Sequence, residues 1–217
     1  SRGNGRLPRA SGGGGKSVKT WLYDFLKPIV RAYYFLVRGI RATGTENVAS
    51  PGGYILCSNH VSASDPFVLA TCARRRLHFM AKAELFKNRI VGGFISAIGA
   101  FPVRRGESDL GAVRESIRLL NEGHVVGIFP QGTRSRENAH THLEPGVALI
   151  ALRAGVKVVP AYIDGPYRLF RKTRVVFGPP VSLDDLGRRF DRATLDKATA
   201  RLDEAIWALK PQASAKA

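Results

Sequence analysis

A histidine and an aspartate lie five positions apart in the segment Asn59-His60-Val61-Ser62-Ala63-Ser64-Asp65. The segment follows residues 53–58, an apolar run that is typical of a buried strand. Across a tight turn, the Asp65 carboxylate could accept a hydrogen bond from one ring nitrogen of His60 and leave the other as a general base. A structural interpretation is also open. Asp65-Pro66 is typical of a helix N-cap followed by proline, and His60 would then be an ordinary turn residue.

No nucleophile accompanies this pair in the sequence. The nearby serines are Ser58, Ser62 and Ser64. None of them lies in a Gly-x-Ser-x-Gly nucleophile elbow. A basic His60 would therefore act directly on a substrate hydroxyl, without a covalent enzyme intermediate.

The sequence shows no pattern of metal ligands. The remaining histidines are His78, His124, His140 and His142. Their spacing does not match a zinc site, so we expect neither a metal nor a cofactor. The two cysteines, Cys57 and Cys72, lie in apolar runs and are predicted to be buried, inert thiols.

Two later segments carry side chains suited to binding phosphate. Arg104 and Arg105 end an apolar strand pattern, and their guanidinium groups could clamp phosphate oxygens. In the segment 129–135, the Gly132-Thr133 turn could offer backbone N–H groups and a hydroxyl, with Arg134 as the counter-charge. Each segment alone is equally consistent with a solvated basic loop.

Strand and helix patterns alternate between residues 39 and 212. Strands are predicted at 40–44, 53–58, 77–81, 100–103, 125–129, 156–163 and 174–178. Helices are predicted at 65–72, 82–98, 110–122, 146–154 and 194–210. This alternation predicts one α/β domain, with a mainly parallel central sheet flanked by helices. The strand 53–58 is apolar on both faces and is predicted to be central, so His60 follows it at the end where such sheets bind ligands.

The N-terminal region differs from this domain. Residues 1–16 are rich in glycine and arginine and are predicted to form a disordered basic tail or a linker. Residues 17–38 place apolar and aromatic side chains at helical spacing beside basic ones, and Pro28 is expected to kink or split the helix. Such a segment lies in a bilayer interface, packs on the protein's own core, or does both in different parts. We recognise no transmembrane span or secretory signal and expect a cytoplasmic location.

The charge of the chain indicates a phosphate-bearing partner. There are 34 Lys and Arg residues against 17 Asp and Glu residues, a formal net charge of +17. Such a surface attracts nucleic acid, anionic lipid or an acidic carrier protein. Charge alone does not choose among these partners.

In this order, the segments resemble the glycerolipid acyltransferase family typified by bacterial 1-acyl-glycerol-3-phosphate (lysophosphatidic acid) acyltransferases. The family's Asn-His-x4-Asp motif matches Asn59, His60 and Asp65. Its other motifs are an apolar strand ending in arginine, a Phe-Pro-Glu-Gly-Thr-Arg-Ser turn and a Val-Pro strand, which match residues 101–105, 129–135 and 158–161. The resemblance spans residues 21–210 and includes the linking segment 81–86.

The resemblance implies roles for these residues. His60 would be the base that acts on the acceptor hydroxyl, and Asp65 would orient it. The donor would be an acyl thioester, either acyl-CoA or acyl carrier protein, and the product phosphatidic acid. The phosphate of the lysophosphatidic acid acceptor would be held by Arg105, the turn Gly132-Thr133-Arg134 and, as a further candidate, Lys82. The enzyme would work at an anionic membrane surface, as a peripheral or monotopic protein on the cytoplasmic face of the cell membrane.

Two positions depart from the family pattern. Gln131 replaces the motif glutamate, and Arg104 stands where many members have aspartate, which makes the pocket more cationic. If the glutamate orients Arg134 or the acceptor, Gln131 would do so more weakly and the head-group preference could differ. Another lysophospholipid or an amino-lipid therefore stays open as the acceptor. A basic nucleic-acid-binding protein and an inactive lipid-binding homologue are further alternatives; the resemblance itself implies no nucleic-acid partner.

Overall fold

The structure of the chain is a computed structural model that describes residues 20–103, 109–131, 143–165, 167, 172–187 and 190–214. Part of the predicted site falls outside these ranges. The candidates there are Arg104, Arg105, Gly132, Thr133 and Arg134. The predicted disordered tail, residues 1–16, also lies outside them.

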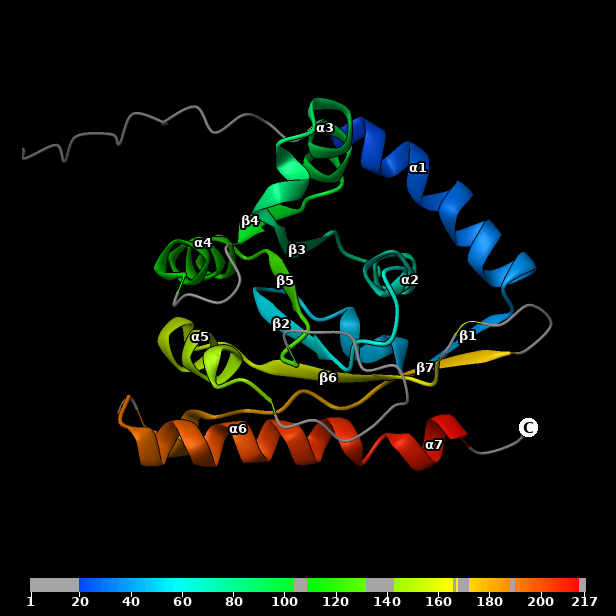
Figure 1. Cartoon of the computed structure of the whole chain (residues 1–217). Coiled ribbons are helices and arrows are strands. Elements are labelled where there is room, and N and C mark those ends of the chain that lie inside the picture. The colour runs from blue at the N-terminus through cyan, green and yellow to red at the C-terminus, as the bar shows by residue number, and fades with distance from the viewer. Residues whose placement is uncertain are drawn as a thin grey trace, which may run out of the picture.

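Within the described residues, the strands form one seven-stranded sheet (Figure 1). They are β1 (Ile40–Thr43), β2 (Tyr54–Ser58), β3 (Leu77–Lys82), β4 (Phe101–Val103), β5 (Val125–Ile128), β6 (Val158–Ile163) and β7 (Thr173–Phe177). The order is β1-β7-β6-β2-β5-β3-β4, and every neighbouring pair is parallel except β6 and β7. All five residues of β2 are buried at the centre of the sheet. The predicted mainly parallel sheet is confirmed.

Helices cover both faces of the sheet (Figure 1). They are α1 (Thr20–Ala32), α2 (Asp65–Cys72), α3 (Arg89–Ala97), α4 (Leu110–Asn121), α5 (Gly146–Ala154), α6 (Arg192–Trp207) and α7 (Lys210–Ser214). Helices α4 to α7 bury their apolar side chains in one core cluster, and α2 packs in the other. Both cysteines are buried and free, as expected, and burial raises the pKa of Cys72 to about 12.

The helix boundaries differ from the prediction in several places, and the predicted helix 194–210 forms two separate helices, α6 and α7. The pattern at 82–98 forms a short 3-10 helix, Ala83–Phe86, followed by α3, because the Asn88 side chain caps a new helix by accepting from the backbone N–H groups of Ile90 and Val91. Pro28 lies inside α1 without splitting it. The departure from α-helical geometry comes later, where Tyr33–Val37 forms a π-helix.

The N-terminal helices have two different apolar faces. The inner face buries Tyr23 and Tyr34, and the Lys27 ammonium donates to the carbonyl of Ala73 beyond the end of α2. The outer face exposes Phe25, Ile29, Tyr33, Leu36 and Val37. Packing on the protein's own core is therefore confirmed for one face only. Among the helices of the described ranges, none combines the length and the apolar composition that crossing a bilayer requires.

Candidate active site

The turn that follows β2 brings His60 and Asp65 into direct contact. His60 Nδ1 lies 2.7 Å from Asp65 Oδ2, and the same oxygen accepts from the backbone N–H groups of Val61 at 2.7 Å and Ser62 at 2.9 Å. Asp65 is the first residue of α2, preceded by Ser64 as the N-cap residue. Its carboxylate points back over the turn, so the interpretation of Asp65 as a helix cap is wrong.

The hydrogen bonds determine which nitrogen of His60 is free. An ionised carboxylate can only accept, so the 2.7 Å contact requires the proton to sit on Nδ1. The lone pair is then on Nε2, which has no hydrogen-bond partner among the described residues. His60 is 7% exposed and Asp65 is fully buried. This is the arrangement of a general base held in one tautomer by a carboxylate.

Contacts with the end of β6 and with the segment after β5 hold this turn in place. Asn59 Nδ2 donates to the carbonyl of Ile163 at 2.9 Å, and Asn59 Oδ1 accepts from the Ile163 N–H at 2.8 Å. Gln131, which follows β5, accepts from the backbone N–H of His60 through Oε1 at 3.1 Å. Asn59, which begins the Asn-His-x4-Asp motif, and Gln131, which replaces the motif glutamate, therefore both position the His60 turn.

The imidazole of His60 is the first ring of an aromatic stack. Its centroid lies 4.2 Å from that of Phe129, and Phe129 lies 5.8 Å from Phe79 with nearly parallel rings. Gly127 leaves room for this stack, since a Cβ there would lie 2.1 Å from a ring carbon of Phe79. The stack limits rotation of the His60 ring and connects it to the interior.

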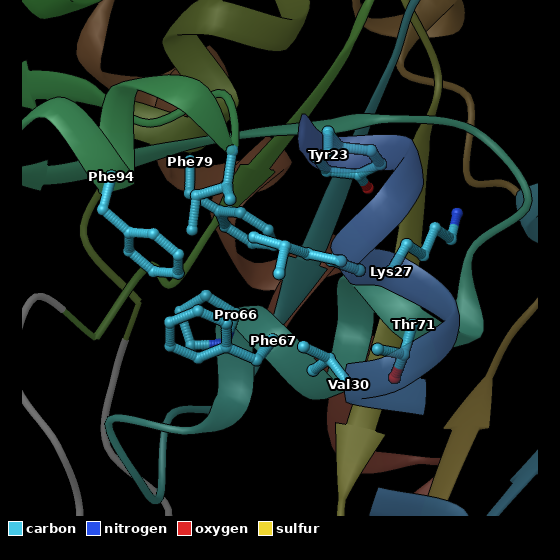
Figure 2. Close-up of a pocket in the computed structure, with 11 residues that line it drawn as sticks. Tyr23, Lys27, Val30, Pro66, Phe67, Thr71, Phe79 and Phe94 are labelled. Atoms are coloured by element: carbon cyan, nitrogen blue, oxygen red, sulfur yellow. The ribbon is translucent and has the colours of Figure 1, made fainter. Parts of the chain in front are cut away.

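Beyond the stack, helices α1, α2 and α3 line a partly open apolar cavity of about 90 Å³. Pro66, Phe67, Phe79 and Phe94 gather around it, and the Lys27 ammonium turns away from these rings (Figure 2). Phe79 belongs to both the stack and the cavity wall, while Pro66 directly follows Asp65. The cavity thus lies beside the His60–Asp65 pair.

The parallel strands bring further predicted residues to the same edge. β2, β5 and β3 are parallel neighbours, so the segments that follow β2 and β5 and the last residue of β3 share one edge. Lys82 is that last residue and is exposed, whereas Gln131 is buried against the His60 turn. Among the described residues, Lys82 makes no contact with His60 or Asp65.

One contact of the pair was missed by sequence reasoning. The hydroxyl of Tyr167 donates to Asp65 Oδ1 at 2.7 Å. Tyr167 lies 102 residues beyond Asp65, in the connection between β6 and β7, and belongs to no motif or periodic pattern. The sequence contains no signal for this pairing.

Comparisons with known proteins find a family match, similar sequences and a similar structure. A family described as acyltransferase matches residues 39–164. A 1-acyl-sn-glycerol-3-phosphate acyltransferase of Bacillus subtilis is 31% identical over 195 residues, which cover 87% of this chain and 97% of that protein.

The chain belongs to the acyltransferase family. A second acyltransferase relative, the 1-acyl-sn-glycerol-3-phosphate acyltransferase of Streptococcus pneumoniae, is 34% identical over 78% of this chain and 66% of its own length. The crystal structure of the 1-acyl-sn-glycerophosphate (LPA) acyltransferase of Thermotoga maritima has a TM-score of 0.69 and 22% identity, covering 90% of this chain and 83% of that one. The similarity to the Thermotoga maritima structure shows a shared fold. Acyltransferase membership confirms the resemblance that the ordered motifs predict.

Proposed function

We propose that this protein transfers an acyl chain from an acyl thioester to the free hydroxyl of 1-acyl-glycerol-3-phosphate, giving phosphatidic acid. The observation that carries the proposal is the contact between His60 Nδ1 and Asp65 Oδ2, which leaves Nε2 available as a base at the carboxyl edge of the sheet. The printed names of the curated relatives support this acceptor. A nucleic-acid-binding protein would account for the charge of +17 but not for the family membership.

The proposed chemistry is a direct displacement. Nε2 of His60 takes the hydroxyl proton as the acceptor oxygen attacks the thioester carbonyl, and Asp65 stabilises the imidazolium that forms. The tetrahedral intermediate then collapses as the carbon–sulfur bond breaks, and the imidazolium returns the proton to the thiolate. A general base in this position contributes about 10²- to 10⁴-fold to the rate. Acyl-CoA and acyl carrier protein are both suitable donors.

The acceptor phosphate is proposed to bind cationic groups near this edge. Lys82 ends β3 and is exposed there, and Arg104 and Arg105 directly follow β4 in the chain. The segment Gly132-Thr133-Arg134 directly follows Gln131. Clamping the phosphate would hold the free hydroxyl at His60, and orientation of this kind supplies up to about 7–11 kcal/mol of barrier reduction.

The acyl chain is proposed to enter the apolar cavity beside the pair. Aromatic and aliphatic side chains line this cavity, and Phe79 in its wall stacks on Phe129, which stacks on the His60 ring. Each methylene that moves from water into such a space contributes about 0.8 kcal/mol. Because α1 forms part of the cavity wall and exposes apolar side chains outward, we propose that the enzyme lies on a membrane surface as a peripheral or monotopic protein. The net charge of +17 favours an anionic membrane, and we propose that the enzyme works on its cytoplasmic face.

The proposal is tested by transfer of a labelled acyl chain from a thioester to lysophosphatidate. His60→Ala is expected to abolish transfer while its circular dichroism and melting temperature stay close to wild type. His124→Ala is the matched control, because the His124 side chain is half exposed and lies outside the site, and it should retain full activity. Normal turnover by His60→Ala would rule out the proposed mechanism.

The acceptor is tested in the same assay. Lysophosphatidate should be preferred over lysophospholipids with larger head groups and over amino-lipids. If a different acceptor is used at least tenfold more efficiently, the acyl-transfer chemistry stands and the proposed acceptor is replaced. Gln131 stands where the family's motif has glutamate, and this difference is the reason for comparing the acceptors.

A further inference from the structure

We infer that Tyr167 is a positioning residue for the His60–Asp65 pair and that the N-terminal π-helical segment holds Tyr167 in place. The inference rests on the proposed function, since the pair is treated as the catalytic base and its orienting carboxylate. It adds a residue that none of the sequence motifs includes.

The first evidence is the division of donors between the two oxygens of Asp65. Oδ2 accepts from His60 and from the two backbone N–H groups of the turn. Oδ1 accepts from Tyr167 alone among the described residues, at 2.7 Å. Because Asp65 is fully buried, loss of this donor leaves a buried carboxylate oxygen without its protein partner. Tyr167 therefore fixes the rotation of the carboxylate about its Cβ–Cγ bond, and this rotation decides whether Oδ2 faces Nδ1.

Tyr167 is suited to donate in this position at any working pH. Burial, reinforced by the Asp65 carboxylate, raises the pKa of Tyr167 well above its usual range. The phenol consequently remains protonated. A protonated phenol facing an ionised carboxylate makes a short, charge-assisted hydrogen bond.

The second evidence is the anchoring of Tyr167 by the end of the N-terminal segment. The Arg38 guanidinium donates through Nη2 to the backbone carbonyl of Tyr167 at 3.1 Å. The buried ring of Tyr34 lies 6.5 Å from the Tyr167 ring, at a tilt of 56°. Tyr34 lies in the π-helix and Arg38 is its C-cap residue.

The same segment also forms part of the exposed apolar face. Tyr33, Leu36 and Val37 point to the outside of the π-helix, whereas Tyr34 and Arg38 reach inward to Tyr167. A continuous series of contacts thus runs from the outer surface through Tyr167 to Asp65 and His60. Displacement of the segment would be transmitted to the base.

The test is Tyr167→Phe, which keeps the ring and removes only the hydroxyl. We expect kcat to fall about tenfold to a hundredfold, because small misplacements of catalytic groups have effects of this size. The KM values for the thioester and for lysophosphatidate should change by less than about twofold, since Tyr167 is not among the residues that line the cavity and none of its contacts with described residues is to Lys82. Loss of a donor leaves the carboxylate more strongly attractive to the imidazolium, so the acid limb of the pH–rate profile should move to higher pH.

Tyr162→Phe is the matched control. Tyr162 is fully buried in β6, and its hydroxyl has no hydrogen-bond partner among the described residues. Removing this hydroxyl should leave kcat and the pH profile unchanged. Arg38→Ala is the second variant, and it should reproduce the fall in kcat by releasing the Tyr167 backbone. A kcat within twofold of wild type in Tyr167→Phe would overturn the inference.

A readout without turnover separates this inference from the proposed function. The Nδ1 proton of His60 should give a downfield NMR resonance that is assigned by its loss in His60→Gln. In Tyr167→Phe this resonance should shift or broaden, and in Tyr162→Phe it should not. If wild-type protein transfers no acyl chain to lysophosphatidate, the proposed function fails while this measurement still tests Tyr167. An unchanged resonance in both tyrosine variants would overturn the positioning role.

Discussion

At the scale of single residues, the spacing of the pair follows from hydrogen bonding in the turn. The four residues between His60 and Asp65 are enough for the chain to reverse and for the N–H groups of Val61 and Ser62 to meet Oδ2. That oxygen thereby organises the backbone and the imidazole together. With a shorter or longer spacer, one carboxylate oxygen could not bind both the backbone N–H groups and the imidazole.

Gln131 provides a prediction at this scale. Gln131→Leu removes the acceptor of the buried His60 N–H, and an unsatisfied buried donor costs about 1–3 kcal/mol. We expect a lower free energy of unfolding in urea and a lower kcat. Gln131→Glu keeps an acceptor oxygen of similar reach and should retain stability. If Gln131→Leu matches wild type in both measurements, the contact has no positioning role.

At the scale of elements, the close approach of β3 and β5 creates the aromatic stack. Gly127 on β5 pairs with Phe79 on β3, and the absence of a side chain at Gly127 gives the Phe79 ring its place. The ring then ends the His60 stack on one side and forms part of the cavity wall on the other. Strand pairing thus determines the wall of the proposed acyl site.

Gly127→Ala is predicted to disturb this arrangement. The new Cβ would lie 2.1 Å from Phe79, so the ring must leave its position, and overpacking of this kind costs about 1–3 kcal/mol. Thermal and urea unfolding should show the loss, together with a lower kcat. Gly93→Ala is the control, because a Cβ at Gly93 of α3 meets nothing within 4 Å and the change should be neutral or stabilising. Equal stability of both variants would contradict the packing argument.

The sequence predicts these elements better than it predicts their contacts. Strands such as β2 and helices such as α4 have a uniform or periodic apolar pattern, so their positions follow within a few residues. The contacts of Gln131 and Tyr167 depend on how distant segments align in three dimensions. Motif position revealed that Gln131 belongs to the site but suggested a different partner. Tyr167 lies between strands, where no periodicity constrains it.

At the scale of the whole molecule, apolar surface gathers on the side that covers the cavity. Helices α1 and α3 lie next to each other there (Figure 1), and both expose large apolar side chains. Phe25 of α1 is 61% exposed and Ile90 of α3 is 84% exposed, and Leu36 of the π-helix that follows α1 is 83% exposed. With a net charge of +17, such a face suits an anionic bilayer, and the acyl chain would pass from the lipid layer directly to the cavity.

Leu36→Glu is predicted to weaken binding to vesicles that contain anionic lipid. Withdrawing one leucine side chain from the lipid costs about 1.5–3 kcal/mol, so binding in a sedimentation assay should fall at least about tenfold. The melting temperature should not change, because Leu36 makes little contact with the protein. Leu110→Glu, at an exposed leucine of α4, should bind as wild type. Equal binding by all three proteins would rule out the proposed membrane face.

Acid stability is the second prediction for the whole molecule. Burial, together with the nearby His124 and Arg76, lowers the pKa of His78 from 6.5 to about 4. Its Nε2 is buried without a hydrogen-bond partner in the described part of the chain, so folding favours the neutral ring. The unfolded chain binds a proton below about pH 6.5, and the free energy of unfolding should fall as pH drops from 6.5 to 4.

Since one pKa unit corresponds to about 1.4 kcal/mol, His78 accounts for up to about 3 kcal/mol of this loss. Urea unfolding at several pH values checks the expectation. His78→Leu should show a flatter dependence than wild type between pH 6.5 and 4, and both should run parallel above pH 6.5. Parallel curves through the acid range would exclude His78 as the source.

The paired hydrogen bonds between Asn59 and Ile163 have a consequence for the order of folding. They join residues 104 positions apart, and the bond from Tyr167 to Asp65 spans a similar separation. Closing such long loops is a late step for a growing or refolding chain, because local helices form first. A chain released before β6 would contain both His60 and Asp65 but would lack the bonds with Ile163 and Tyr167 that hold the turn and the carboxylate. Competence for proton transfer is therefore acquired only when the second half of the sheet docks on the first.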